Sequence, residues 1–478
     1  MRTAIIISLL LLFSPVTTSY AQTTLHVPTE YPTIQDAITA SANGDTVLVA
    51  AGTYEENINF SGKEIRLVSS DGAGVTVLDG RRLGSVVTLN QAEGPDTLLQ
   101  GFTLRNGLAN AGGGVYTNGA SPTVKFNIIK DNEAAGSTGG GGVYSTGGVA
   151  AISCNIICDN LAYQQGGGIC AYSTETLISN NIIYGNYVWG NFFGNPPHSD
   201  TYGGGIATFN SPNSKMINNV VYDNTVEGDY FTVIPNGGGI YSYYAIPLSN
   251  SIVWNNHGGG QVDGYMFTSN INYCDIQGGT TYGSHNINLN PLFNDAAQGD
   301  FHLTAESPCI DAGINFAFQQ YDTDFEGDKR ILDSNGDNNS RVDMGADEFM
   351  MIRGDSPTLS EATGGSIHFF LDAGSDDANR IYLILGSISG TVPGTPLPFG
   401  YVTLPLNWDW FTELVWNYKT SALFQDFLGT LDAGGQAHAQ LNVGPLPPGS
   451  AGIILYFAFT CNNPFNIASH PVELLIVP

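Results

Sequence analysis

Paired carboxylates are the side chains of this sequence that could do acid-base chemistry. Asp131 and Asp159 stand at equivalent positions in two similar segments, and Asp200 and Asp229 lie in longer segments that follow. A glycoside hydrolase needs two carboxylates near each other, one of them as the acid. Aspartate is also common in turns, because its side chain bonds to nearby backbone groups. The four residues are therefore candidate catalytic residues, with a structural role in turns as the alternative.

Aromatic side chains offer a second chemistry, the stacking of rings on sugars. Tyr184, Tyr222 and Trp254 take one position in successive repeats, each after an aliphatic residue that we expect to point inward. Trp189 and Tyr230 lie in insertions that follow at the same corner. We expect these residues to form an aromatic flank that binds glycan, because solenoids usually build binding sites from insertions on one face. The alternative is that the inserted loops fold back and cover each other.

An acidic segment offers a third chemistry, the binding of Ca²⁺, which prefers carboxylate and amide oxygens. The candidate ligands are Asp322, Asp324, Asp328, Asp333, Asn335 and Asp337. The last three have the spacing of the first half of an EF-hand loop. Asn338 replaces the glycine of that loop, however, and Met344 stands where the bidentate acid is expected. A calcium site and a solvated acidic turn are both compatible with this pattern.

Five similar repeats must position these side chains. Each begins with a glycine triplet, and the triplets start at Gly112, Gly140, Gly166, Gly203 and Gly237. Their spacings of 28, 26, 37 and 34 residues suit a supersecondary unit that stacks on its neighbours. Alternating apolar residues predict β-strands, so stacking places equivalent residues in columns. We expect a structural ladder of side-chain amides from Asn132, Asn160, Asn186, Asn224 and Asn256.

The glycine triplets and the Asn-x-aliphatic-x-x-Asn phrases resemble the right-handed parallel β-helix proteins of the pectin-lyase-like superfamily. The stretch HVPTEYPTIQDAITASANGDTVLVAAGTYEENINFSGKEIRLVSS resembles the N-terminal cap of such solenoids. Within it, Thr33 can start a short helix whose apolar residues Ile34, Ala37 and Ile38 would cover the open end of the stack. The phrases SPCIDAG and VDMGADEF resemble the closing segment of bacterial choice-of-anchor Q proteins. These resemblances imply a capped right-handed β-helix over residues 22–305 and a location at the cell surface.

The remaining segments complete the domain organisation. Residues 1–21 have the parts of a Sec-type signal peptide with cleavage near Ala21, which predicts a secreted or cell-surface protein. Residues 306–355 form an acidic closing segment or linker, and residues 356–478 have the turn-separated apolar runs of a β-sandwich. In that domain, Trp408, Trp410 and Trp416 either stack on sugars or complete the core and its edge.

The net charge of the chain indicates which kinds of partner it can bind. A formal charge of −28 disfavours nucleic acid, and no later apolar run is long enough for an integral membrane span. A polysaccharide or surface glycan is the expected partner, and calcium is the expected cofactor if there is one.

Three functions are compatible with these observations. We favour a protein without enzymatic activity that binds a neutral glycan or a surface partner through the aromatic flank. A polysaccharide-active enzyme is the first alternative. Between Arg105 and Lys329 the chain has no arginine, which disfavours a polyuronate lyase and leaves a glycoside hydrolase as the better enzymatic hypothesis. A structural stalk is the second alternative.

Overall fold

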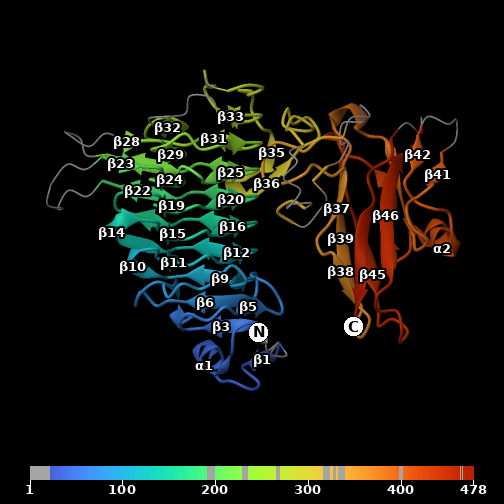
Figure 1. Ribbon diagram of the computed structural model, residues 1–478. Helices are drawn as coiled ribbons and strands as arrows, with labels where there is room; N and C mark the ends of the chain where they lie inside the picture. The colour runs from blue at the N-terminus through green and yellow to red at the C-terminus, as the bar shows by residue number, and fades with distance from the viewer. Residues whose placement is uncertain are drawn as a thin grey trace, which may run out of the picture.

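The structure, a computed structural model, describes residues 22–190, 200–228, 235–264, 270–281, 283–315, 323–326, 330–331, 340–397, 402–462, 465 and 467–478. A parallel β-helix formed by the N-terminal part stands beside a sandwich formed by the C-terminal part (Figure 1). The predicted fold class, all β with a parallel β-helix followed by a β-sandwich, is confirmed. Within the described residues, no helix is long and apolar enough to cross a bilayer.

Four parallel sheets form the walls of the β-helix. The ten-stranded sheet consists of β1 (Thr24–Val27), β2 (Thr46–Val49), β5 (Arg66–Ser69), β8 (Leu98–Gln100), β12 (Thr123–Lys125), β16 (Ala151–Ser153), β20 (Leu177–Ser179), β25 (Lys215–Ile217), β30 (Leu248–Ser249) and β33 (Ile271–Asn272). The nine-stranded sheet consists of β3 (Gly52–Tyr54), β6 (Thr76–Asp79), β9 (Thr103–Arg105), β13 (Ile128–Lys130), β17 (Ile156–Cys158), β21 (Ile182–Tyr184), β26 (Val220–Tyr222), β31 (Ile252–Trp254) and β34 (Asp275–Ile276).

Two further sheets complete the walls of the β-helix. The five-stranded sheet consists of β10 (Leu108–Ala111), β14 (Glu133–Gly139), β18 (Leu161–Ala162), β22 (Tyr187–Trp189) and β27 (Thr225–Glu227). The eight-stranded sheet consists of β4 (Ile58–Asn59), β7 (Val87–Leu89), β11 (Val115–Asn118), β15 (Val143–Thr146), β19 (Ile169–Tyr172), β24 (Ile206–Phe209), β29 (Ile240–Ser242) and β32 (Val262–Gly264). The insertions add a two-stranded sheet of β23 (Thr201–Tyr202) and β28 (Pro235–Asn236).

The interior of the β-helix is filled by columns of aliphatic side chains. Val115, Val143 and Ile169 are consecutive partners in the eight-stranded sheet, and all three are fully buried. Burying one such side chain contributes about 1.5–3 kcal/mol relative to leaving it exposed. The open end of this core is covered by α1 (Ile34–Ala40), whose Ile34 and Ile38 are fully buried in the same cluster. The short helix expected after Thr33 is therefore present, with Ile34, Ala37 and Ile38 buried.

The glycine triplets lie where neighbouring coils meet backbone to backbone. A Cβ atom on Gly113 would stand 2.7 Å from the carbonyl oxygen of Gly141, and one on Gly114 would stand 2.6 Å from that of Gly142. The first glycine of this triplet, Gly112, has a φ of 61°, which glycine adopts at little cost. The triplet recurs because each of the five repeats makes this close approach.

The predicted asparagines form one hydrogen-bonded column. Asn132 Nδ2 donates to Asn160 Oδ1 over 3.0 Å, and Asn160 Nδ2 donates to Asn186 Oδ1 over 2.9 Å. The column continues from Asn186 to Asn224 over 2.9 Å and from Asn224 to Asn256 over 3.0 Å. Each accepting oxygen also receives the backbone N–H of the preceding asparagine. The buried amides therefore satisfy one another, which a buried polar group requires.

A short hairpin and a sandwich follow the β-helix. The hairpin of β35 (Phe293–Asp295) and β36 (Asp300–Leu303) lies between the two bodies (Figure 1). One sheet of the sandwich consists of β37 (Ile352–Gly354), β39 (Gly365–Asp372), β45 (Gln436–Val443) and β43 (Phe424–Gln425). The other consists of β38 (Thr358–Ser360), β47 (Val472–Val477), β46 (Ile454–Cys461), β40 (Ile381–Ser387) and β44 (Leu428–Thr430). A two-stranded sheet of β41 (Thr395–Pro396) and β42 (Thr403–Leu404) and the helix α2 (Trp410–Tyr418) complete this domain, whose first strand begins at Ile352.

Candidate functional site

Three of the predicted glycan-binding aromatics do not lie on an open surface. Tyr184, Tyr222 and Trp254 project from the nine-stranded sheet as expected, but they are half-buried against a cluster that includes Phe301 and Leu303 of the closing hairpin. The Phe301 ring centroid lies 5.1 Å from that of Tyr184 and 5.3 Å from that of Tyr222. The prediction of one exposed flank is therefore wrong for these residues. The physical reason is that the hairpin removes its own phenylalanines and this aromatic column from water together.

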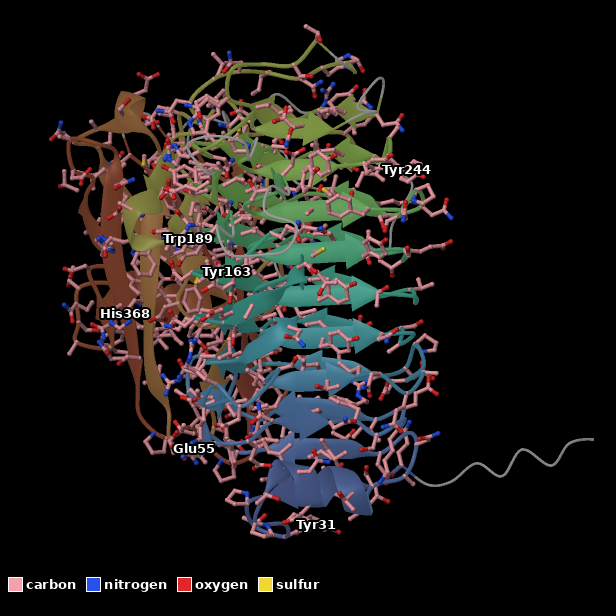
Figure 2. All side chains as sticks on the ribbon, turned by 90° about the vertical axis from the view of Figure 1, so that its left-hand side faces the viewer. Tyr31, Glu55, Tyr163, Trp189, Tyr244 and His368 are labelled. Carbon is pink, nitrogen blue, oxygen red and sulfur yellow. The ribbon has the colours of Figure 1, made fainter. Side chains whose placement is uncertain are left out.

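The other two predicted aromatics belong to the insertions. Trp189 ends β22 and is 47% exposed, and Figure 2 shows it near Tyr163. Tyr230 lies outside the described residues, as does the candidate acid Asp229.

The other candidate catalytic carboxylates lie at turns or bond to nearby side chains. Asp131 and Asp159 both have a φ of 55° and are exposed at the same corner of successive coils. This left-handed conformation is easiest for glycine, asparagine and aspartate, and Gly185 takes the same position one coil later with a φ of 63°. Asp200 accepts a hydrogen bond from the Tyr202 hydroxyl over 3.3 Å. The left-handed turn conformation supports the structural interpretation of Asp131 and Asp159.

One predicted calcium ligand, Asp324, lies in a buried cluster of acidic residues. Asp324 is fully buried, and its carboxylate accepts the backbone N–H groups of Glu326 over 2.9 Å and of Glu348 over 3.1 Å. The other predicted ligands, Asp322, Asp328, Asp333, Asn335 and Asp337, lie outside the described residues.

Arg330 supplies the positive charge in this buried acidic cluster. It is 2% exposed, and its guanidinium lies 2.8 Å from Glu348 and donates to the carbonyl oxygens of Asp343, Gly345 and Ala346. Burial raises the pKa of Asp343 to about 7, although backbone N–H groups and Arg330 oppose the shift. Burial likewise raises the pKa of Glu348 well above its ordinary value, against the attraction of Arg330. Arg330 therefore holds the VDMGADEF phrase together by donating to three of its carbonyl oxygens and by contacting Glu348.

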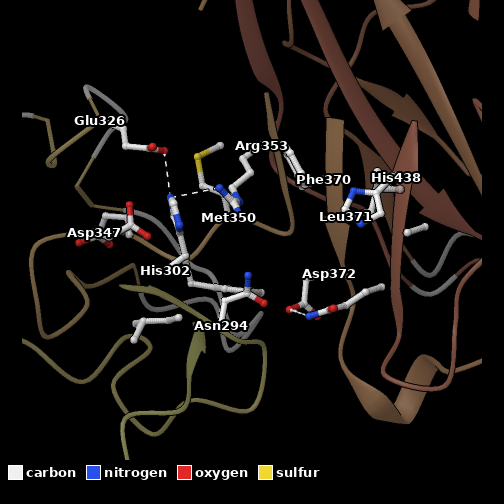
Figure 3. Close-up of a pocket in the computed structure, with 15 residues that line it drawn as sticks. Asn294, His302, Glu326, Asp347, Met350, Arg353, Phe370, Leu371, Asp372 and His438 are labelled. Carbon is white, nitrogen blue, oxygen red and sulfur yellow. Dashed lines mark hydrogen bonds and ion pairs between the residues drawn. The ribbon is translucent and has the colours of Figure 1, made fainter. Parts of the chain in front are cut away.

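A second charged cluster lies between the hairpin and the sandwich, beside a cavity of about 70 Å³ (Figure 3). His302 Nδ1 bonds to Asp300 Oδ1, and its Nε2 lies 3.3 Å from Glu326 Oε2. Arg353 Nη1 lies 3.2 Å from the same Nε2, and the Arg353 guanidinium lies 4.7 Å from the Phe370 ring centroid. Burial alone would lower the pKa of His302, but Asp347, Asp300 and Glu326 together raise it to about 10.

This cluster has the ligand types of a metal site but not the charge balance of one. His302, Glu326 and Asp347 each bring a ligand atom to within 4.8 Å of the other two. A divalent cation would share this space with the Arg353 guanidinium, whose Nη1 lies 3.2 Å from His302 Nε2, and two positive charges repel at this distance. The cluster is better described as a charge network that joins the hairpin to the sandwich.

An open groove runs along the eight-stranded sheet. It has a volume of about 620 Å³, and it is lined by Ser85, Asn110, Ala111, Tyr116, Asn118, Thr138, Tyr144, Thr146 and Tyr172. Its floor comes from β11, β15 and β19, and its wall comes from β10 and the long strand β14. All of its lining residues are uncharged. We call this feature the aromatic groove.

The rings of the groove are ordered by the register of the sheet. Tyr116 and Tyr144 are direct strand partners, and their rings stack with centroids 5.7 Å apart and planes 7° apart. Tyr172 is 40% exposed, and its ring centroid lies 6.3 Å from that of Phe209 on the next strand. The sequence carried a signal for this column, because an aromatic residue follows the glycine triplet and a β-branched residue in several repeats, as in GGGVY. The column was not predicted, because the aromatic residues of the nine-stranded sheet repeat more regularly in successive repeats.

Comparison with protein families finds no match to the chain, and comparison with curated proteins finds no significant similarity.

Proposed function

We propose that this chain is a secreted or cell-surface protein that binds a neutral polysaccharide along the aromatic groove. The observation that carries the proposal is the composition of the groove: the exposed Tyr172 and the half-buried Tyr116, which stacks on the buried Tyr144, lie among hydroxyls and amides, with no charged lining residue. Tyrosine combines an apolar ring face with a polar hydroxyl, which suits the apolar faces and hydroxyls of a sugar. The resemblances to pectin-lyase-like β-helices and to choice-of-anchor Q closing segments support a location outside the cell.

Charge favours a neutral ligand over an acidic one. The chain carries 43 acidic and 15 basic residues, so its field repels polyuronates and other polyanions. The groove itself offers hydrogen-bonding groups without charge, such as Asn118, Thr138 and Thr146. A neutral polymer gains these contacts without any electrostatic cost.

The same composition favours binding over cleavage. Hydrolysis of a glycosidic bond needs two carboxylates around it, and the lining residues of the groove include none. Asp131 and Asp159, the candidate catalytic pair, lie at turns on another corner of the coil. We therefore propose a binding protein rather than an enzyme.

Affinity electrophoresis of the mature chain tests the proposal. We expect slower migration in gels that contain hydroxyethyl cellulose, galactomannan or soluble starch than in gels that contain polygalacturonate. Tyr172→Ala and Tyr116→Ala should each weaken the retention by about tenfold, because truncation of a central aromatic contact has effects of this size. Tyr273→Ala is the matched control, because Tyr273 stacks on His285 at another corner of the β-helix.

Two results would overturn the proposal. Equal retention of Tyr172→Ala, Tyr116→Ala and the unaltered chain would show that the groove is not the binding site. New oligosaccharide products, detected by mass spectrometry with or without Ca²⁺, would show that the protein is an enzyme.

A further inference from the structure

A second aromatic surface lies on the C-terminal domain. Trp408, Trp410, Trp416 and Tyr418 are exposed by 48%, 65%, 44% and 55%, although tryptophan and tyrosine usually bury most of their surface. They come from α2 and the residue pair before it, and we call them the tryptophan platform. The opposite face of α2 packs into the sandwich core through residues such as Phe411.

The platform is held rigidly by the residue between its first two tryptophans. Asp409 Oδ1 accepts the backbone N–H groups of Phe411 over 2.8 Å and of Thr412 over 3.0 Å. Its Oδ2 accepts the backbone N–H groups of Ile388 and Ser389, both over 2.9 Å. Partial burial alone would raise the pKa of Asp409, but these donors hold it well below its usual range. A surface fixed in this way loses little conformational freedom when a ligand binds.

Two rings of the platform, Trp408 and Trp416, lie against each other at an angle. The ring centroids of Trp408 and Trp416 lie 6.4 Å apart with their planes at 53°. The Lys419 ammonium lies 4.4 Å from the Trp416 ring centroid and donates to the Trp416 carbonyl over 2.6 Å. This lysine therefore fixes one ring at the edge of the surface.

The charged residues near the tryptophan platform indicate which kind of ligand it can bind. Lys419 is the basic residue of the α2 segment over 408–419, and Glu413 on the same helix is exposed and acidic. An amphipathic helix that binds anionic membranes carries lysines and arginines on its polar face, which this helix does not. A polyanion would also meet the negative charge of the whole chain. The surface therefore suits a neutral polymer that presents both apolar faces and hydroxyl groups.

We propose that the tryptophan platform is a second binding site for neutral polysaccharide, so that the chain is bivalent. This site does not depend on the aromatic groove, because it lies on another domain. The helix α2 lies at the edge of the sandwich that faces away from the β-helix (Figure 1), whereas the groove lies on the β-helix. The two sites can therefore bridge separate polymer chains, or distant parts of one chain, and raise the overall affinity by avidity.

The test uses the full mature chain and the same hydroxyethyl cellulose, galactomannan and starch gels. We expect Trp410→Ala combined with Trp416→Ala to weaken retention by about tenfold or more. Trp410→Phe should keep most of the retention, because phenylalanine preserves an aromatic face at this position. Ile453→Ala, which removes an apolar side chain that is 40% exposed elsewhere on this domain, should leave retention unchanged. Unchanged melting of each variant shows that the sandwich remains folded.

Fluorescence gives an independent readout. Three of the five tryptophans of the chain lie in the platform, so galactomannan should change the tryptophan emission of the Tyr172→Ala variant, in which the groove is impaired. Retention lost only in Tyr172→Ala and unchanged in the tryptophan variants would overturn the platform while keeping the groove. Loss only in the tryptophan variants would keep the platform and refute the groove. Binding of the chain to phosphatidylcholine vesicles, without binding to any of the glycans, would overturn the platform as a glycan site.

Discussion

Replacement of His302 by glutamine should destabilise the contact between the closing hairpin and the sandwich. Glutamine keeps hydrogen-bonding groups near Asp300 and Glu326 but removes the positive charge. The His302 side chain is 20% exposed, and its pKa is raised from 6.5 to about 10. At ~1.4 kcal/mol for each pKa unit, this difference sets an upper limit of about 5 kcal/mol. Solvent screening and the cost of burying charges reduce it, so we expect a loss of about 2–3 kcal/mol.

The raised pKa of His302 also predicts how the stabilisation should change with pH. The folded state raises the pKa of His302, so the stabilisation is fully present below the unfolded value of 6.5 and is lost as pH rises through about 10. The difference in free energy of unfolding between the unaltered chain and His302→Gln should therefore be constant in mild acid and shrink steadily in alkali.

Urea denaturation at about pH 6, about pH 8 and about pH 10 measures this difference. His368→Gln is the matched control, because His368 also pairs with an aspartate through its Nδ1 but is 51% exposed. It should cost at most about 1 kcal/mol, as exposed ion pairs do. A His302 ring that titrates near pH 6.5 by NMR, or a stability difference that grows in alkali, would refute the charge network.

Three further predictions concern stability. Asn186→Ala should lower the free energy of unfolding by about 2–4 kcal/mol, because it leaves buried donors and acceptors in both neighbouring coils without partners. Asn213→Ala on the surface should cost little, and equal effects of the two variants would contradict the structural role of the asparagine column. Arg330→Met should lower stability by about 3–5 kcal/mol in urea denaturation, because it leaves three buried carbonyl oxygens without their donor. Arg81→Met should cost about 1 kcal/mol or less, because the Arg81 ion pair is exposed, and equal effects of the two variants would contradict the role of Arg330. If the acidic segment binds calcium, EDTA should lower the melting temperature and added Ca²⁺ should restore it, and an unchanged melting temperature would count against the site.

The repeating part of the fold could be predicted because its signals are local and periodic. The glycine triplets mark the corner where coils touch, and the Asn132 column marks the corner where amides stack, so each residue type reports its own surroundings. The N-terminal helix was predictable for the same reason, since Ile34 and Ile38 lie on one face of a short capped segment.

The covering of Tyr184 and Tyr222 could not be predicted in this way. It depends on Phe301, which lies far along the chain and belongs to no repeat. Nothing in a periodic pattern says which face of a solenoid a later segment will cover. The aromatic groove was predictable in principle from Tyr116 and Tyr144, but only once the sheet that stays open was known.

The direction of the hydrogen bonds in the β-helix has a mechanical consequence. Both the strand ladders and the asparagine column run from coil to coil, so a force applied along the axis pulls on one coil's bonds at a time rather than on all of them together. The interval from Asn160 to Asn186 is 26 residues and that from Asn186 to Asn224 is 38 residues. At ~3.6 Å per extended residue, each coil that peels away should release about 90–140 Å of chain. A polymer held by the groove and another held by the platform would thus be joined by a tether that lengthens in steps under load instead of breaking at once.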